Sequence, residues 1–318
     1  MQFHKKTLIC LILLVCSTHG QFKWYLSPET GFNRNENGRH RGLSSVEGFI
    51  FYSAPALEGE WSVNGQFRSE FYGISDPDRI ERYKFQTAFS RLIWDIDWQI
   101  ALNVQRYVFK QVSTSAFNLI FAQLSCDYPL TVSSSFQGIL SAGNSFIRNG
   151  DEGEGDVQMG ELQHITAANT YLSFGGGIYT ERYGVRRKEI EGTNRYSALK
   201  VGPVISLNYL KIYILRLQYR YLFFPDQAGH EQNLRLLAGR IISNRWTVFF
   251  LMDYYFRSAQ SSLPVRLNAE NRIYIKCGYT LSEHVEAYIK TGYFRDEFEN
   301  GIRTFTRWNL LFGVEIRS

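Results

Sequence analysis

Paired acidic residues are the first feature of this chain that could do chemistry. Asp95 and Asp97 are two residues apart, so both carboxylates point the same way if the segment is an extended strand. Such a pair could bind a cation or act as a general acid and base. Many lysines and arginines fall at equivalent alternate positions in other segments, so we expect ordinary ion pairing of these aspartates instead.

Other candidate sites have weaker support from spacing. The run DEGEGD at 151–156 offers oxygen ligands for Ca²⁺, but its spacing is not that of an EF-hand loop. The glycines of FGGG at 174–177 precede no Gly-Lys-Ser/Thr, so we expect them to permit a bend or close packing. His40 and His164 have no serine in a His-x-Ser setting, and the chain has no Gly-x-Ser-x-Gly. We therefore predict no catalytic residue, no bound metal and no cofactor.

A period of two predicts the elements that must position these charges. In 211–223 and 245–257, aromatic and aliphatic residues alternate with polar ones, and the same pattern recurs in 94–105. Trp246, Phe250 and Phe256 share one face, whereas Thr247 and Asp253 lie on the other. Because successive side chains of a strand point to opposite faces, these segments are predicted to be β-strands.

Sixteen strands can be placed along the chain, joined alternately by short and longer connections. The segment 157–167 alternates poorly, and the count falls to 14 if it is a loop. A Gly- and acid-rich loop is expected at 144–156, and a polar one at 181–194. The short connections, all on one side, are expected at 54–60, 93–94, 127–129, 168–169, 209–211, 243–244 and 282–283.

The first residues are typical of a secretory signal peptide. MQFHKK is basic, TLICLILLVCST is apolar, and cleavage is expected after Gly20, which leaves 21–318 as one domain. That remainder has no apolar run of the roughly 18 residues that a membrane-spanning helix needs. The net charge is only +5 and no basic stripe is present, so we expect no nucleic-acid partner.

These features together resemble bacterial outer-membrane β-barrel proteins of the porin-like class. The last segment, 303–317, places Trp308, Leu310 and Phe312 on one face, as in the C-terminal assembly strand of that class, although this chain ends in Arg317 and Ser318. The resemblance implies an all-β, transmembrane, antiparallel up-and-down barrel in the outer membrane of a Gram-negative cell. It also implies periplasmic termini, contact with outer-membrane lipid and lipopolysaccharide, and handling by the outer-membrane assembly machinery. Oligomerisation is common in the class.

In such a barrel the aromatic face meets lipid and the opposite face lines the lumen. A charged side chain facing lipid at mid-membrane costs about 2–4 kcal/mol, so the charged residues must line a wet interior or pair with one another. Most of them are basic. The residues that we expect to line the lumen are Arg68, Glu70, Asp95, Asp97, Lys200, Arg216, Arg220, Arg272, Lys276, Lys290, Arg303 and Arg307.

Three functions are compatible with this prediction. A channel would let small hydrophilic solutes diffuse passively, with a modest preference for anions because the wall is basic. Alternatively, the same charges would form a salt-bridged plug, and the barrel would be a structural or assembly protein of the outer membrane. A third hypothesis is a membrane-embedded lipid hydrolase that uses His40 or His164.

Overall fold

Sixteen antiparallel strands form one closed barrel, in which each strand pairs with its neighbours in sequence and β1 pairs with β16. The computed structural model describes residues 20–35, 40–72, 78–110, 114–148, 153–189, 192–211, 213–225, 229–243, 245–257, 268–298 and 303–318. In these ranges no helix is long and apolar enough to cross a membrane. Residues 1–19, and with them nearly all of the expected signal peptide, lie outside the described part.

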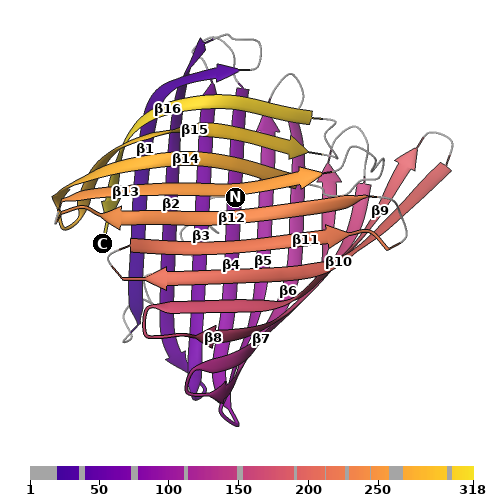
Figure 1. Ribbon diagram of the computed structural model, residues 1–318. Coiled ribbons are helices and arrows are strands. Elements are labelled where there is room, and N and C mark those ends of the chain that lie inside the picture. The colour runs from indigo at the N-terminus through magenta and orange to yellow at the C-terminus, as the bar shows by residue number, and fades with distance from the viewer. Residues whose placement is uncertain are drawn as a thin grey trace.

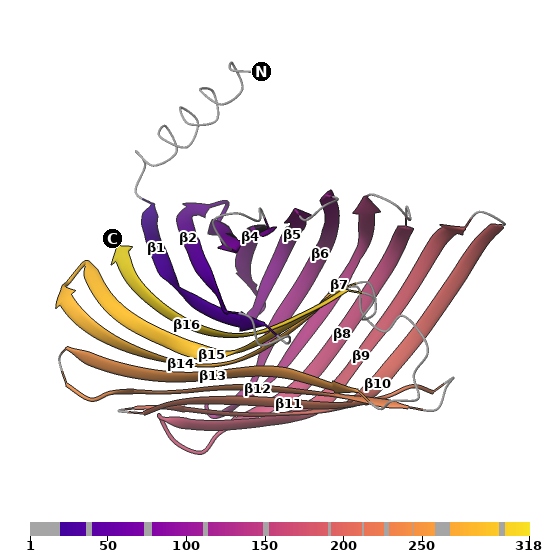
Figure 2. The same cartoon turned by 90° about the horizontal axis from the view of Figure 1, so that it is seen from above.

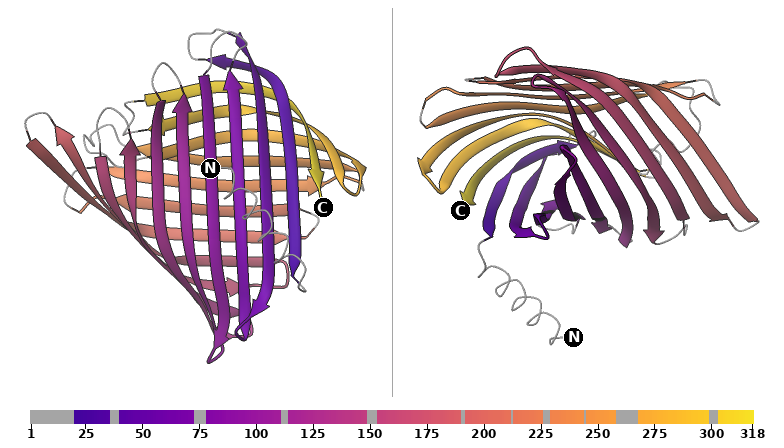
Figure 3. Two further views of the ribbon diagram at one scale, coloured as in Figure 1. Left: turned by 180° about the vertical axis from the view of Figure 1, so that it is seen from behind. Right: turned by 90° about the horizontal axis from the view of Figure 1, so that it is seen from below.

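The strands of the two opposite walls cross at a steep angle. In Figure 1, β2–β6 run upright behind while β11–β16 run across the front, and Figure 3 shows the same crossing from behind. Seen from above in Figure 2, the strands curve continuously from one wall into the other. Strands of a closed barrel tilt by about 35–45° from its axis, so front and back strands are expected to cross in this way.

The expected number of sixteen strands is confirmed, because the doubtful segment 157–167 belongs to a full strand. The strands are β1 (Gln21–Asn35), β2 (His40–Ala56), β3 (Gly59–Tyr72), β4 (Asp78–Ile93), β5 (Ile96–Lys110), β6 (Thr114–Thr131), β7 (Ser134–Arg148), β8 (Gly153–Ala167), β9 (Leu172–Glu189), β10 (Gly192–Leu210), β11 (Tyr213–Phe223), β12 (His230–Ile241), β13 (Trp246–Arg257), β14 (Asn268–Ser282), β15 (Val285–Phe298) and β16 (Arg303–Arg317).

Several stretches expected to be loops are strand. The polar segments 144–156 and 181–194 are strand wherever the structure describes them, at 144–148, 153–156, 181–189 and 192–194. The turn expected at 127–129 is wrong as well. β6 continues through these residues, Pro129 pairs with Ser135, and the turn lies at 132–133. Strand ends that carry polar residues on both faces show no apolar alternation, so the pattern could not reveal them.

Two of the short turns place bulky apolar residues at their tips. Leu57-Glu58 and Trp94-Asp95 have φ angles of 49°, 61°, 53° and 62°, as in two-residue type I′ hairpins. Leu57 is 84% exposed and Trp94 is 88% exposed. The short connection expected at 93–94 therefore lies at 94–95, and Asp95 belongs to the turn.

The outer face of the barrel is apolar, with basic and aromatic side chains at its margins. Trp246, Ile100 and Phe312 are 51%, 61% and 47% exposed, and all occupy the outward parity of their strands. Near the turns, Arg240 lies 4.8 Å from the ring of Tyr213 and Lys211 lies 4.7 Å from that of Tyr171. At the opposite end, Arg79 lies 4.7 Å from the ring of Phe71. These pairs mark both edges of an apolar band suited to lipid.

Replacing Ile100 by Arg tests the outer face directly. Ile100 lies in the middle of the apolar band, so the substitution should destabilise the barrel in lipid vesicles by about 2–4 kcal/mol in urea unfolding. Gln105→Arg, on the inward face of the same strand, is the matched control and should cost much less. Equal losses for the two variants would contradict the assignment of the faces.

Candidate functional site in the barrel interior

The interior of the barrel is unusually rich in charged groups. Among the side chains that the structure describes, buried positions include more polar and charged residues than apolar ones. Soluble proteins show the opposite, because a buried charge without partners is strongly disfavoured. The buried charges therefore need partners, and most of them find these in three networks.

The first network crosses the line where the barrel closes. Arg68 on β3 makes ion pairs with Glu70 (2.7 Å), with Glu47 on β2 (2.7 Å) and with Glu29 on β1 (3.4 Å). Glu29 also forms an ion pair with Lys290 of β15, and Glu70 forms one with Arg307 of β16 at 2.8 Å. This closure network thus joins the first three strands to the last two, alongside the backbone pairing of β1 with β16.

The second network is centred on Lys200 of β10, whose side chain is completely buried. Its Nζ lies 2.9 Å from a carboxylate oxygen of Glu181 on β9 and 3.2 Å from one of Glu231 on β12. The hydroxyl of Tyr179 donates to Glu181 at 2.6 Å. Two carboxylates and one ammonium group held out of water in this way form a tightly coupled cluster.

The third network connects β8 with β10 and β11 across the glycines of β9. Arg220 and Gln218 on β11 both contact Glu161 on β8, and Ser206 on β10 donates to Gln163 on β8 at 2.9 Å. A Cβ at Gly175 would lie 2.6 Å from the Ser206 hydroxyl oxygen, and one at Gly177 would lie 1.9 Å from a backbone oxygen of β8. The FGGG run therefore serves close packing, as expected, and lets side chains of β8 and β10 meet.

A cavity of about 470 Å³ adjoins this third network. Its polar lining comes from β7, β8 and β10–β13 and includes Arg216, Arg235 and Asp253. Arg235 is paired with Asp253 at 3.3 Å and with the Tyr255 hydroxyl at 3.2 Å. Arg216 is exposed to the cavity and makes no ion pair within the described part of the chain. An unneutralised guanidinium here can attract an anionic solute.

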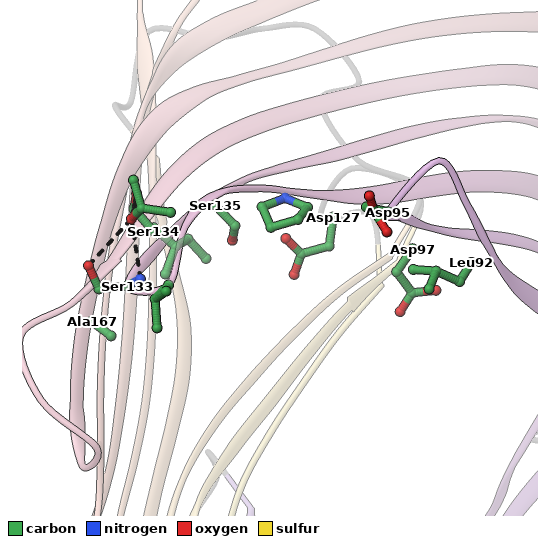
Figure 4. Close-up of a pocket in the computed structure, with 12 residues that line it drawn as sticks. Leu92, Asp95, Asp97, Asp127, Ser133, Ser134, Ser135 and Ala167 are labelled. Atoms are coloured by element: carbon green, nitrogen blue, oxygen red, sulfur yellow. Dashed lines mark hydrogen bonds between the residues drawn. The ribbon is translucent and has the colours of Figure 1, made fainter.

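One cavity at the turn-side end of the barrel has an acidic lining. Asp95, Asp97 and Asp127 line a second cavity of about 410 Å³, together with Ser133–Ser135 (Figure 4). Asp127 accepts a hydrogen bond from Gln137 at 2.8 Å. Asp95 and Asp97 are both exposed in or beside a turn, and within the described residues the ion pairs that we expected for them are not seen. No three described His, Cys, Asp or Glu residues are arranged to bind a metal.

The remaining predicted lumen residues fall into the same interior. Lys276 contacts Glu286 at 2.9 Å and Glu315 at 3.0 Å, and Arg272 on β14 is half-buried. The side chain of Arg303 lies outside the described residues, as do those of His40 and of Asp151, Glu152 and Glu154 in the acidic run. His164 points outward and lies 5.2 Å from the ring of Phe136.

The prediction from sequence missed most of the acidic partners. Glu181 lay in the segment 181–194 that was predicted to be a loop, and Glu29, Glu47, Glu161 and Glu231 were not among the predicted lumen residues. The spacing of two within a strand could have placed some of them in the interior. Glu29 and Glu181 each lie two residues after a residue of the inward face, Ser27 and Tyr179 respectively. With such carboxylates included, the buried charged side chains that the structure describes are close to balanced in charge, whereas the lumen residues predicted from the sequence are mainly basic.

A match to a solved structure, CdiB, supports the architecture. CdiB from Acinetobacter baumannii is 13% identical with a TM-score of 0.54; the match covers 93% of this chain and only 60% of CdiB. OccAB4 from the same organism is 8% identical with a TM-score of 0.46, covering 95% and 98%. The alcaligin outer membrane receptor FauA from Bordetella pertussis is 8% identical with a TM-score of 0.43, covering 94% and 76%.

The chain has the fold of an outer-membrane β-barrel. At such low identities the likeness concerns the fold alone. No family model matches the sequence, and no curated protein matches it.

Substituting Lys200 tests the second network. Lys200→Met would leave Glu181 and Glu231 buried without their shared cation, so we expect a loss of about 3–5 kcal/mol in urea unfolding. Lys23→Met, at the exposed start of β1, is the control and should change stability by less than about 0.5 kcal/mol. A Lys200 variant as stable as the control would show that the cluster is not coupled as described.

Proposed function

We propose that this protein is a passive outer-membrane channel for small hydrophilic solutes with a modest preference for anions. Its apolar outer face suits a lipid bilayer, and its interior combines ion-paired walls with polar cavities. The observation that carries the proposal is Arg216, a cation exposed to an interior cavity and without an ion pair among the described residues. Rings or single positions of Arg in a pore favour anionic permeants.

The anion preference is modest because the rest of the interior is nearly neutral. Cations of the three networks are offset by carboxylates, and such pairs give little net field at a distance. Asp95 and Asp97 at the turn-side mouth oppose the entry of anions. In this proposal both termini and the short turns face the periplasm. A signal peptide directs export of the chain and is cleaved after Gly20, directly before β1 begins at Gln21.

A plugged structural barrel is the second candidate function. The observation that favours it is the complete burial of Lys200 together with the dense closure network, since both fill part of the interior with side chains. Such a barrel would hold a position in an outer-membrane assembly and would not conduct ions.

Planar bilayer recordings separate these two functions. Purified, folded protein should give discrete conductance steps if it is a channel. Folding is verified beforehand by the shift in gel mobility that heating causes in intact barrels. Folded protein that inserts but gives no steps would contradict the channel and leave the plugged barrel.

Reversal potentials in a salt gradient test the origin of the selectivity. Arg216→Gln should lower the anion-to-cation permeability ratio by about fourfold, because removing a unit positive charge at roughly 10 Å in water disfavours the anion by about 0.4 kcal/mol and favours the cation by as much. Asp97→Asn should raise the ratio. Arg106→Gln, on the outward face of β5, is the control and should leave it unchanged. An unchanged ratio in Arg216→Gln would remove the proposed determinant while the conductance stands.

A further inference from the structure

A third hollow, of about 620 Å³, lies on the outer face of the barrel across β5–β10. Its outward-facing floor consists of small residues on four successive strands: Ala122 on β6, Ala142 on β7, Gly160 on β8 and Thr180 on β9. Larger apolar side chains border it, among them Ile100 at 61% and Leu140 at 63% exposure. The wall is therefore indented at this place, between flanking apolar side chains.

Polar side chains close this outer groove at one end only. Going from the short turns toward the longer connections, the outward residues of β9 are apolar or small up to Thr180, and Arg182 follows. On β8, Gln158 follows Gly160 in the same direction, and Arg182 and Gln158 are directly paired across the two strands. Both side chains are exposed, and Arg182 makes no ion pair within the described residues.

This combination limits what can occupy the outer groove. An apolar trough that ends in an exposed guanidinium and an amide is complementary to a molecule with an acyl chain and an anionic phosphate head. A second copy of this chain fits poorly, because a twofold interface would set one hollow against another hollow.

We propose that the outer groove is a binding site for one anionic membrane lipid. An acyl chain lies over Ala122, Ala142 and Gly160, and the phosphate is held by Arg182 with Gln158 as a hydrogen-bond donor. The site is separate from the lumen, so it does not depend on whether the barrel conducts.

Native mass spectrometry of the full-length, folded barrel in neutral detergent tests this site with phosphatidylglycerol as the probe. The wild-type protein should retain one phosphatidylglycerol in preference to zwitterionic phosphatidylcholine. Arg182→Gln should weaken phosphatidylglycerol binding about fivefold, which is the effect of one Lys or Arg near an anionic lipid surface. Ala142→Phe should reduce retention by filling the groove.

Arg106→Gln is the matched control, since Arg106 is also an exposed, outward-facing arginine but lies outside the groove. It should bind phosphatidylglycerol like the wild type, and heat-shifted gel mobility should show that all variants are folded. Unchanged binding in Arg182→Gln, or an equal loss in Arg106→Gln, would overturn the proposal. So would a stable dimer that Ala142→Phe dissociates, because a second copy would then occupy the groove.

Discussion

The structure depends on one constraint: charged side chains of the membrane-spanning strands must avoid lipid. In a strand each residue is fixed to one face, so the constraint sends the charges inward together. Once inside, they must be paired, because an unpaired buried charge costs several kcal/mol. Arg68 shows the consequence most clearly, since its guanidinium pairs with carboxylates of three strands, Glu29, Glu47 and Glu70, and so ties the start of the chain to the closure of the barrel.

This extensive ion pairing also determines which interior charges are neutralised by a partner side chain. Lys200 and Arg220 are committed to carboxylates of neighbouring strands, so their charges are largely cancelled. Arg216 differs because its row on the neighbouring strands carries Asn208 and Leu237 rather than an acid. Among the side chains that the structure describes, Arg216 therefore lies in the interior without the carboxylate partner that Lys200 and Arg220 have.

Sequence reasoning recovered the barrel and its strand number because the apolar half of each strand lies in lipid. There the period of two is enforced, as Trp246, Val248 and Phe250 on β13 illustrate. It failed where strands extend beyond the apolar band, since both faces are polar there and 181–189 resembled a loop. That failure removed Glu181 from the predicted lumen. The groove between Ile100 and Leu140 was also out of reach, because small residues form a hollow only when β6–β9 are aligned.

Accessibility of spin labels along β5 in lipid bilayers tests the central claim most directly. The accessibility of single labels from Ile96 to Gln105 should alternate along the strand. Labels at even positions should be accessible to oxygen dissolved in the lipid, and labels at odd positions to a water-soluble nickel reagent. The alternation should persist through the middle of the strand, where Ile100 and Ala101 are neighbours. If both parities respond only to the water-soluble reagent, or neither responds to oxygen, the outer face does not meet lipid and the account of the barrel is contradicted.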